Sequence, residues 1–474
     1  MSIRRSEPNV LVAGVGRCDI TPAPGTPQGG WGAQTHERGI GADMPMEVRV
    51  LALAQADLRI LIVDADAIGF DAEWTQKIVT AISALTEIDR KYIRFSCSHT
   101  HAGPNTFRLK NISTGLDMAT SYLEGLPLRI AGAAWQALQQ MRPVKIGVGA
   151  GACEINRNRR VRSPEGESVV GVNEEVPADH SLGVIRIDAE DGGVLATVVH
   201  YACHPTTCGW QNTRFSPDYP GPMRQTVERE LGGTCLFLQG TAGDLGPRLG
   251  FTGDLNVCRQ LGHELGLAAA SVASSIHTRK DRAEYQSLMH SGANIAQYRY
   301  SEVPLPQPAC AMVSQTLLLP IRKLESQEKI ARDLELLRRR VQKLRDAGET
   351  EAMRLMQARA TQMGWRMENA RLYSTRTQAE WPMQVIRLGE IGLVSVAGEP
   401  FSSIGERIRE QSPARYTFVS GYSNGGFGYI PDREAYISGG YEVEATPFSE
   451  EAADVVVESA LKTLNELFGE MREA

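Results

Sequence analysis

The sequence predicts an α/β protein, a mixed β-sheet core with flanking helices and an inserted α-helical hairpin. Short apolar runs alternate with amphipathic segments through the first half of the chain, which favours this class. An Asp-Gly-Gly turn at residues 191–193 joins two apolar runs as a hairpin, so some neighbouring strands must be antiparallel. From residue 324 to 379 the composition shifts to Arg, Glu, Gln, Leu and Met at helical spacing.

Hydrophobic periodicity places the elements of the first half. Short apolar runs bounded by turn residues predict strands, and longer runs with apolar residues three or four apart predict helices. The predicted strands are Val10–Val15, Glu47–Leu53, Ile60–Asp64, Tyr92–Cys97, Lys145–Val148, Leu182–Asp188, Val194–Cys203 and Cys235–Gln239. The predicted helices are Trp74–Ile88 and Met118–Met141.

The second half contains the inserted hairpin. Its first apolar stripe is Leu334, Leu337, Val341 and Leu344, and its second is Met353, Met356, Ala360 and Met363. The break at Asp346-Ala-Gly348 separates them, which predicts two antiparallel helices. We expect the stripe to pack against its twin or a second subunit, so a homo-oligomer is expected through the hairpin. A closing amphipathic helix is predicted at Pro447–Glu470, and one domain is expected over residues 1–474.

Composition and charge exclude several classes of protein. The apolar content of 42% is that of a globular protein, and a net charge of −6 argues against nucleic acid as a partner. No run of about 18 apolar residues predicts a transmembrane helix, and no apolar signal segment follows the basic start. The eight cysteines are scattered through apolar contexts, which is typical of free thiols in a reducing compartment. The sequence therefore predicts a cytoplasmic protein.

Three histidines lie where predicted strands end. His99 and His101 are two residues apart after an apolar run, so on a strand they point to one face, roughly 7 Å apart. His204 comes immediately before Pro205, which biases it towards an extended conformation at the exit of another strand. Histidines in this arrangement either form a metal site or are solvated side chains at strand ends.

Two oxygen-bearing side chains follow later in the chain. Glu399 ends an apolar strand in Gly392–Phe401, where its carboxylate is either a ligand or a favourable charge at the start of the helix predicted at Phe401–Gln411. Tyr422 and Tyr429 lie in a Gly-rich loop rather than in a core stripe.

Together these segments resemble the catalytic domain of the neutral ceramidase family, zinc-dependent amidases that cleave N-acyl sphingosine. Any one motif is weak, but several occur in the family's order and cover most of the chain. They are Gly14–Pro22, Ser98–Pro104, Ile155–Arg157, His204–Thr206, Gly240–Pro247, Ala397–Pro400 and Ser423–Ile430.

The resemblance implies a site, position by position. It implies Zn²⁺ held by His99, His204, Glu399 and Tyr429, although Tyr436 and Tyr441 are near enough in sequence to be confused with the last of these. It also implies that His101 transfers protons and that Arg157 holds the substrate carbonyl or a neighbouring oxygen. We expect Asp244 to support the site by orienting a ligand or loop, the alternative being a turn-forming Asp. Imidazole and carboxylate are ordinary zinc ligands, and a phenol can ligate beside a cation.

The chain also departs from the family pattern. Gly246 replaces the serine of the family's Gly-Asp-Val-Ser-Pro motif, so the nucleophile must be activated water. The charged insertion at 324–379, the missing trailing β-sandwich and the missing secretion signal put a membrane lipid substrate in doubt. We therefore expect a small-molecule or lipid-like N-acyl amide as substrate.

The predicted function is a zinc-dependent amidohydrolase that cleaves an amide bond with metal-activated water. A zinc-dependent esterase or lactonase uses the same parts and is the nearest alternative. A non-catalytic ligand-binding relative is a further alternative. A barrel amidohydrolase also uses His-x-His, but there the motif opens the first strand, whereas here several predicted strands precede it.

Overall fold

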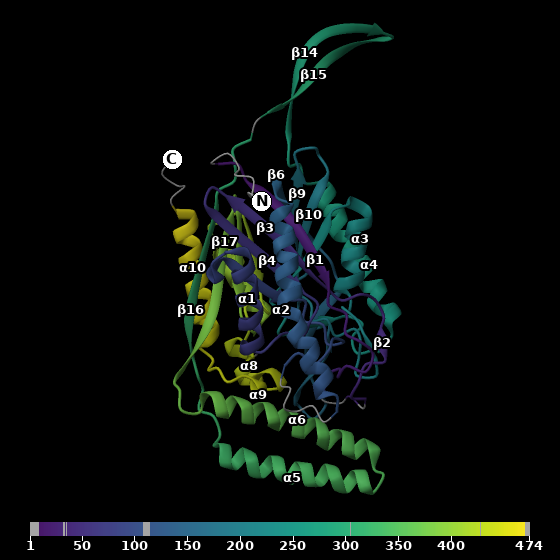
Figure 1. Ribbon diagram of the computed structural model, residues 1–474, viewed down its shortest axis with the longest axis vertical. Coiled ribbons are helices and arrows are strands. Elements are labelled where there is room, and N and C mark those ends of the chain that lie inside the picture. Colours follow the sequence, from purple (N-terminus) through teal and green to yellow (C-terminus); the bar gives the residue numbers. More distant parts are fainter. Residues whose placement is uncertain are drawn as a thin grey trace.

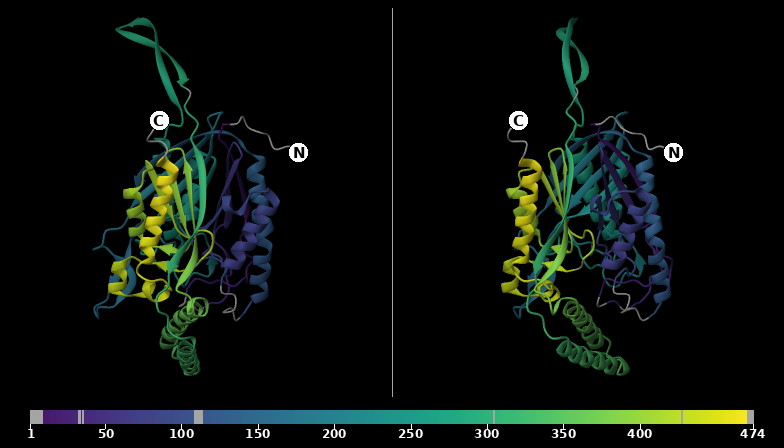
Figure 2. Two further views of the ribbon diagram at one scale, coloured as in Figure 1. Left: turned by 90° about the vertical axis from the view of Figure 1, so that its left-hand side faces the viewer. Right: turned by 60° about the vertical axis from the view of Figure 1, so that its left-hand side comes forward.

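The computed structural model describes residues 9–31, 34, 36–107, 114–303, 305–426 and 428–469. Its core has four layers: helices, a large β-sheet, a smaller β-sheet and a second layer of helices (Figures 1 and 2). Two hairpins extend from opposite ends of this core, one made of strands and the other of helices (Figure 1). The predicted fold class, a mixed α/β core with an inserted helical hairpin, is confirmed.

The large sheet has eight strands in the order β12-β10-β9-β6-β1-β3-β4-β5. The pairs β4·β5 and β10·β12 are parallel and the remaining neighbours antiparallel, so the sheet is mixed as predicted. Its strands are β1 (Val12–Asp19), β3 (Glu47–Gln55), β4 (Leu58–Ala65), β5 (Ile93–Cys97), β6 (Arg142–Ala152), β9 (Ser181–Ala189), β10 (Val194–Tyr201) and β12 (Thr234–Gln239). Every strand predicted in the first half is present, with its ends moved by a few residues.

The smaller sheet has the order β16-β17-β18-β20 and faces the large sheet. Its strands are β16 (Cys310–Pro320), β17 (Gln378–Leu388), β18 (Ile391–Val396) and β20 (Tyr416–Ser420). Strands such as β3 alternate between two cores: Val50 packs towards the helices, and Leu51 packs towards the smaller sheet. Because both faces of the large sheet are buried, its strands are apolar on both sides.

Helices cover the two outer faces of the paired sheets. The large sheet carries α1 (Ala72–Thr86), α2 (Leu116–Gln139), α3 (Pro220–Leu231) and α4 (Leu255–Ser274). The smaller sheet carries α7 (Ser402–Gln411) and α10 (Ala452–Phe468). Among the described residues, no helix is both long enough and apolar enough to cross a membrane.

The closing helix begins later than predicted. It starts at Ala452 rather than near Pro447, because residues 447–449 run extended beside the end of β16, where Phe448 pairs with Ile321. The Ser449 N–H also donates to the Pro320 carbonyl, so these backbone groups are already bonded outside a helix. Glu470, the predicted last residue, lies outside the described residues.

Short strand pairs and helices complete the fold near the strand ends. The strands are β2 (Gly41–Ala42), β7 (Asn156–Arg162), β8 (Ser168–Asn173), β11 (Arg214–Phe215), β13 (Leu245–Pro247), β19 (Glu399–Pro400) and β21 (Tyr429–Ile430). The helices are the 3-10 turn η1 (Arg90–Tyr92), α8 (Arg433–Ser438) and α9 (Tyr441–Ala445). The helical hairpin consists of α5 (Gln327–Asp346) and α6 (Thr350–Tyr373), and the strand hairpin of β14 (Lys280–Ser291) and β15 (Ala293–Val303).

Candidate metal centre

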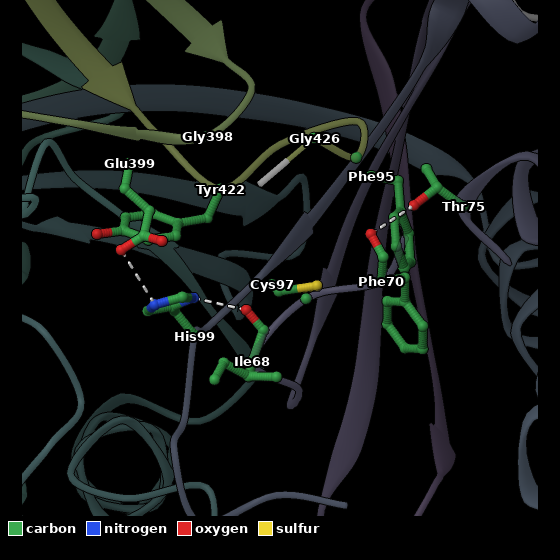
Figure 3. Close-up of a pocket in the computed structure, with 12 residues that line it drawn as sticks. Ile68, Phe70, Thr75, Phe95, Cys97, His99, Gly398, Glu399, Tyr422 and Gly426 are labelled. Carbon is green, nitrogen blue, oxygen red and sulfur yellow. Dashed lines mark hydrogen bonds and ion pairs between the residues drawn. The ribbon is translucent and has the colours of Figure 1, made fainter. Parts of the chain in front are cut away.

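The candidate site forms where strands of both sheets end. His99 follows β5, His204 follows β10, and Glu399 follows β18, so segments far apart in the sequence meet at one place. Figure 3 shows the Glu399 carboxylate above the His99 ring, with the Ile68 carbonyl on the ring's other side. His101 completes a group of three imidazoles with His99 and His204, whose candidate ligand atoms all lie within 4.8 Å of one another.

Each of the three rings bonds a backbone carbonyl through Nδ1. His99 Nδ1 lies 2.5 Å from the Ile68 oxygen, His101 Nδ1 lies 3.0 Å from the Gly30 oxygen, and His204 Nδ1 lies 2.9 Å from the Ala242 oxygen. A carbonyl oxygen only accepts hydrogen bonds, so each Nδ1 must carry the proton. In a neutral ring this leaves Nε2 with a free lone pair.

The three Nε2 atoms converge with one carboxylate oxygen. His99 Nε2 lies 3.1 Å from His204 Nε2 and 3.4 Å from His101 Nε2. Glu399 Oε2 lies 3.5 Å from Nε2 of His99 and of His204, and this buried oxygen accepts no hydrogen bond among the described residues. Lone pairs and an anionic oxygen repel one another at such distances unless a cation lies between them.

The spacing of these atoms fits zinc. Ligand atoms about 2.0–2.1 Å from a tetrahedral zinc ion lie roughly 3.4 Å from one another. The separations of His99 Nε2 from its three neighbours, and of His204 Nε2 from Glu399 Oε2, run from 3.1 to 3.5 Å. The donor set of imidazole nitrogen and carboxylate oxygen is also the one that catalytic zinc sites use.

The surroundings keep the imidazoles of His101 and His204 neutral. Burial, followed by the neighbouring His99, lowers the pKa of His101 well below its usual value. Burial, followed by Arg159 and His99, lowers the pKa of His204 in the same direction. Both rings therefore present a lone pair at neutral pH, which is the form that binds a metal.

Backbone conformations at the cluster are unusual. His99 has φ of 68°, in the left-handed region that side-chain-bearing residues rarely occupy. Tyr422, whose ring centroid lies 4.2 Å from that of His99, has φ of 56°. Such conformations cost of order 1–3 kcal/mol each and cluster at functional sites. The sequence does not reveal them, because neither residue is a glycine.

Tyr429 joins the site through a short strand pair. β19 and β21 are parallel, with Glu399 opposite Tyr429 in the register. Gly398 makes this approach possible, since a Cβ there would lie 2.6 Å from the Gly428 carbonyl oxygen. Burial, together with the Glu399 charge, raises the pKa of the Tyr429 phenol well above its usual value. The phenol is therefore protonated unless a cation lies beside it.

Arg159, rather than the predicted Arg157, reaches Tyr429. Arg159 Nη2 donates to Tyr429 Oη at 3.1 Å, and its Nε donates to Glu442 at 3.1 Å. Burial alone would lower the pKa of Arg159, but the Tyr429 and Glu442 oxygens raise it, so the guanidinium stays charged. The Arg157 guanidinium instead donates to the carbonyls of Glu154 and Asn156.

A β-bulge accompanies this difference. The pairing of β7 with β8 shifts register between Asn158 and Arg160, with the extra residue in β8, and consecutive residues Asn158 and Arg159 of β7 are both buried. Regular alternation would put Arg157 and Arg159 on one face. The sequence offers four arginines in residues 157–162 and no signal that marks the bulge.

Asp244 lies behind the ligands. Its carboxylate accepts hydrogen bonds from the Ser402 N–H at 2.7 Å and from the Ser402 hydroxyl at 2.8 Å, at the start of α7. Its backbone carbonyl accepts from the Arg159 N–H at 2.8 Å. Asp244 thus connects the strand of Arg159 to the helix that follows Glu399. A residue that supports the metal ligands would lie in such a place, and this supporting role of Asp244 stays a prediction. Burial raises the pKa of Asp244 to about 6.

Two small cavities meet at the cluster and share Ile68, His99 and Glu399. The inner cavity, shown in Figure 3, has a volume of about 20 Å³, and its other side chains include Phe70, Phe95, Cys97 and Tyr422. The outer cavity has a volume of about 70 Å³ and is lined also by His101, Tyr429, Tyr441, Trp365 and Asn369. The last two residues belong to α6 of the inserted hairpin, whose part in the site the sequence did not indicate.

Comparisons with known proteins agree with this architecture. No protein-family model and no curated protein sequence matches the chain. Among solved structures, the chain is similar to the neutral ceramidase of Pseudomonas aeruginosa, with a TM-score of 0.69 and 16% identity, over 98% of this chain and 75% of that one. It is also similar to a ceramidase complexed with C2, with a TM-score of 0.66 and 16% identity, over 98% of this chain and 76% of that one. The motif resemblance is therefore confirmed at the level of architecture: the chain has the fold of a neutral ceramidase.

Proposed function

We propose that the protein is a zinc-dependent hydrolase that cleaves an N-acyl amide bond with activated water. One observation carries the proposal: the ligand atoms of three imidazoles lie within 4.8 Å of one another, and the unpartnered Glu399 Oε2 lies 3.5 Å from Nε2 of His99 and of His204. Neutral ceramidases with the same fold add support for the amide as the bond that is cleaved.

The proposal assigns zinc to His99, His204 and Glu399, with Tyr429 as the further ligand implied by the resemblance. Zinc bound there supplies Lewis acidity, which polarises a carbonyl and lowers the pKa of water from about 15.7 towards 7. His101 stands beside these ligands with a free Nε2, so it accepts a proton from water and returns it to the leaving amine.

Arg159 is proposed to take the role that the resemblance implied for Arg157. Its Nη2 donates to Tyr429 Oη, which orients the phenol towards the outer cavity and keeps a positive charge near the developing oxyanion. Arg159 acts through Tyr429, so it is a positioning residue. Asp244 is proposed to hold α7, and with it the chain after Glu399, in place.

Metal analysis and paired substrates test the proposal. We expect about one zinc per chain, lost in His204→Ala and Glu399→Gln but retained in His101→Ala, which should nevertheless lose turnover. Zinc content of Tyr429→Phe decides between ligation, if zinc is lost, and contact with the oxyanion alone, if it is retained. Full activity of the metal-free protein would refute zinc dependence.

Substrate pairs with matched acyl groups separate the enzyme classes. An amidase turns over both the amide and the ester, because the ester has the better leaving group, whereas an esterase or lactonase turns over the ester alone. Bound zinc without turnover of any substrate would point to a non-catalytic relative.

Two parts of the proposal rest on other features. A cytoplasmic location rests on the eight cysteines, which are all free in the structure, as expected in a reducing compartment. A homo-oligomer through the α5–α6 hairpin stays a prediction from its apolar stripe. Thiol titration of the unfolded protein tests the first, and light scattering of a variant lacking residues 326–374 tests the second.

A further inference from the structure

We infer that the cluster accepts only compact amides: a short acyl group in the inner cavity and a small amine in the outer cavity, beneath α6. The inference rests on the proposed amide-hydrolase function and names its substrate class. It starts from the two cavities that meet at His99 and Glu399.

The lining of the cavities assigns the two halves of the substrate. His101 lines the outer cavity and is absent from the inner one. A leaving amine must take up a proton as the carbon–nitrogen bond breaks, so it belongs on the side of His101. The acyl group then extends to the other side of the cluster, where Phe70, Phe95 and Cys97 form an apolar wall.

Volume sets the size limits. One water-sized group needs about 10–15 Å³ of such space, so the inner cavity of about 20 Å³ holds one or two carbon atoms beyond the carbonyl. The outer cavity of about 70 Å³ holds roughly five such groups. Both are far below the roughly 300–1,000 Å³ of sites for drug-sized ligands. Thr75, Gly425 and Gly426 line both the inner cavity and a neighbouring one of about 510 Å³, so these residues form the boundary that a longer acyl group would have to pass.

The inserted hairpin closes the outer cavity. Trp365 packs against Tyr441 with ring centroids 5.6 Å apart, and Tyr441 packs against Tyr429 at the same distance. Asn369 Nδ2 donates to the Ala445 carbonyl at 2.8 Å, which fixes α6 to the end of α9. These contacts make Trp365 the residue that sets the size limit for the amine.

Two substrate series test the two halves separately. The acyl series consists of the N-ethylamides of acetic, butyric and octanoic acid. The amine series consists of the acetyl amides of ethylamine, butylamine and octylamine, which are leaving groups of similar basicity. For the zinc-loaded enzyme we expect kcat/KM to fall at least about tenfold from acetyl to octanoyl, and likewise from ethylamine to octylamine.

Two substitutions should each relax one series only. Phe70→Ala should raise the octanoyl-to-acetyl ratio of kcat/KM about tenfold and leave the amine series unchanged, whereas Trp365→Ala should raise the octylamine-to-ethylamine ratio of kcat/KM and leave the acyl series unchanged. Phe70→Leu is the milder variant if the alanine form does not fold. Leu355→Ala, an exposed residue of α6 that does not line the cavity, is the matched control and should change neither ratio.

Several outcomes would overturn the inference. A wild-type enzyme that prefers octanoyl over acetyl amides removes the acyl limit. Variants that change both series equally, or neither, show that the residues pack without selecting substrate.

A binding measurement separates this inference from the proposed function. Acetate, butyrate and octanoate are products of the acyl series, so calorimetry of their binding to the zinc-loaded protein probes the inner cavity without turnover. Tighter acetate than octanoate binding, reversed by Phe70→Ala, supports the size limit even if no amide is hydrolysed. Turnover of amides with no dependence on size refutes the limit while leaving the proposed function intact.

Discussion

The two ends of the molecule each carry a hairpin, and they differ in how the hairpin meets the core (Figure 1). At one end, α5 and α6 bury Ile330, Leu334, Leu344 and Ala370, and α6 also contributes to the outer cavity. At the other end, all twelve residues of β14 are exposed, and the strand pair projects away from the core. One hairpin has become part of the candidate site, and the other has not.

The difference shows what makes an insertion functional. A helix pair carries its own backbone hydrogen bonds and can dock one face on the core, as α6 does beside α9. A lone two-stranded ribbon has little core of its own and is marginal in water. The ion pair of Lys145 with Glu302 and the hydrogen bonds that Arg279 donates to the carbonyls at the end of β9 attach only its base to the core. We therefore expect changes at the pocket end to alter activity strongly and changes in the strand hairpin to alter it little.

Removing a ligand should have the largest effect. His204→Ala and Glu399→Gln should each lower kcat/KM about a thousandfold, because Lewis-acid stabilisation of several kcal/mol is lost with the zinc. Elemental analysis and steady-state kinetics on an N-acyl anilide measure both losses. His290→Ala, an exposed histidine of β14, is the control from the other end and should retain zinc and rate. Equal losses of zinc and of kcat/KM in His290→Ala would contradict the expected difference between the two ends of the molecule.

Arg159 should have the next largest effect. Arg159→Met should lower kcat about a hundredfold with zinc retained, since loss of one oriented oxyanion contact costs about that much. Arg157→Met is a matched control two residues away and should change kcat less than twofold. The reverse order of effects in these two variants would restore the role that the sequence predicted for Arg157.

Asp244 should make stability depend on pH. Its pKa in the folded protein, about 6, lies above the ordinary 3.8, so its contribution to folding is complete below pH 4 and is lost as pH rises through 6. Wild type should therefore lose about 3 kcal/mol relative to Asp244→Asn between pH 4 and 7. Urea unfolding of the metal-free proteins at several pH values measures this difference. A difference between wild type and Asp244→Asn that does not change with pH would refute the raised pKa.

Shortening the strand hairpin should have the smallest effect. Replacing Arg282–Ser301 with Asn-Gly keeps the pairing of Asp281 with Glu302 and supplies a two-residue turn. We expect kcat/KM to stay within about twofold, because no removed residue contacts the site and exposed positions contribute little. Kinetics and thermal unfolding beside wild type check this. A large loss of activity would give the projecting hairpin a part in catalysis.

Much of the core was predictable because periodicity and turn chemistry are local. Alternation in the first half gave the strands of the large sheet, and the break at Asp346-Ala-Gly348 gave the two inserted helices. The strand hairpin β14–β15 was missed because its strands are mostly polar and almost entirely exposed, so no buried face leaves a pattern. Strands β7 and β8 were missed for a related reason: they form a mostly polar pair.

For the site, the sequence by itself determined which ligand types lie at the ends of strands. The residues that follow directly after apolar runs, where the strands end, are His99, His101, His204 and Glu399. Only the tertiary structure decided which of them meet, since convergence depends on the register of separate sheets and on the pairing of Glu399 with Tyr429. It also decided that Arg159 is buried against Tyr429 and Glu442, and that α6 packs on the core and bounds the outer cavity. Local patterns fix what each segment offers, whereas contacts across hundreds of residues fix what the segments build together.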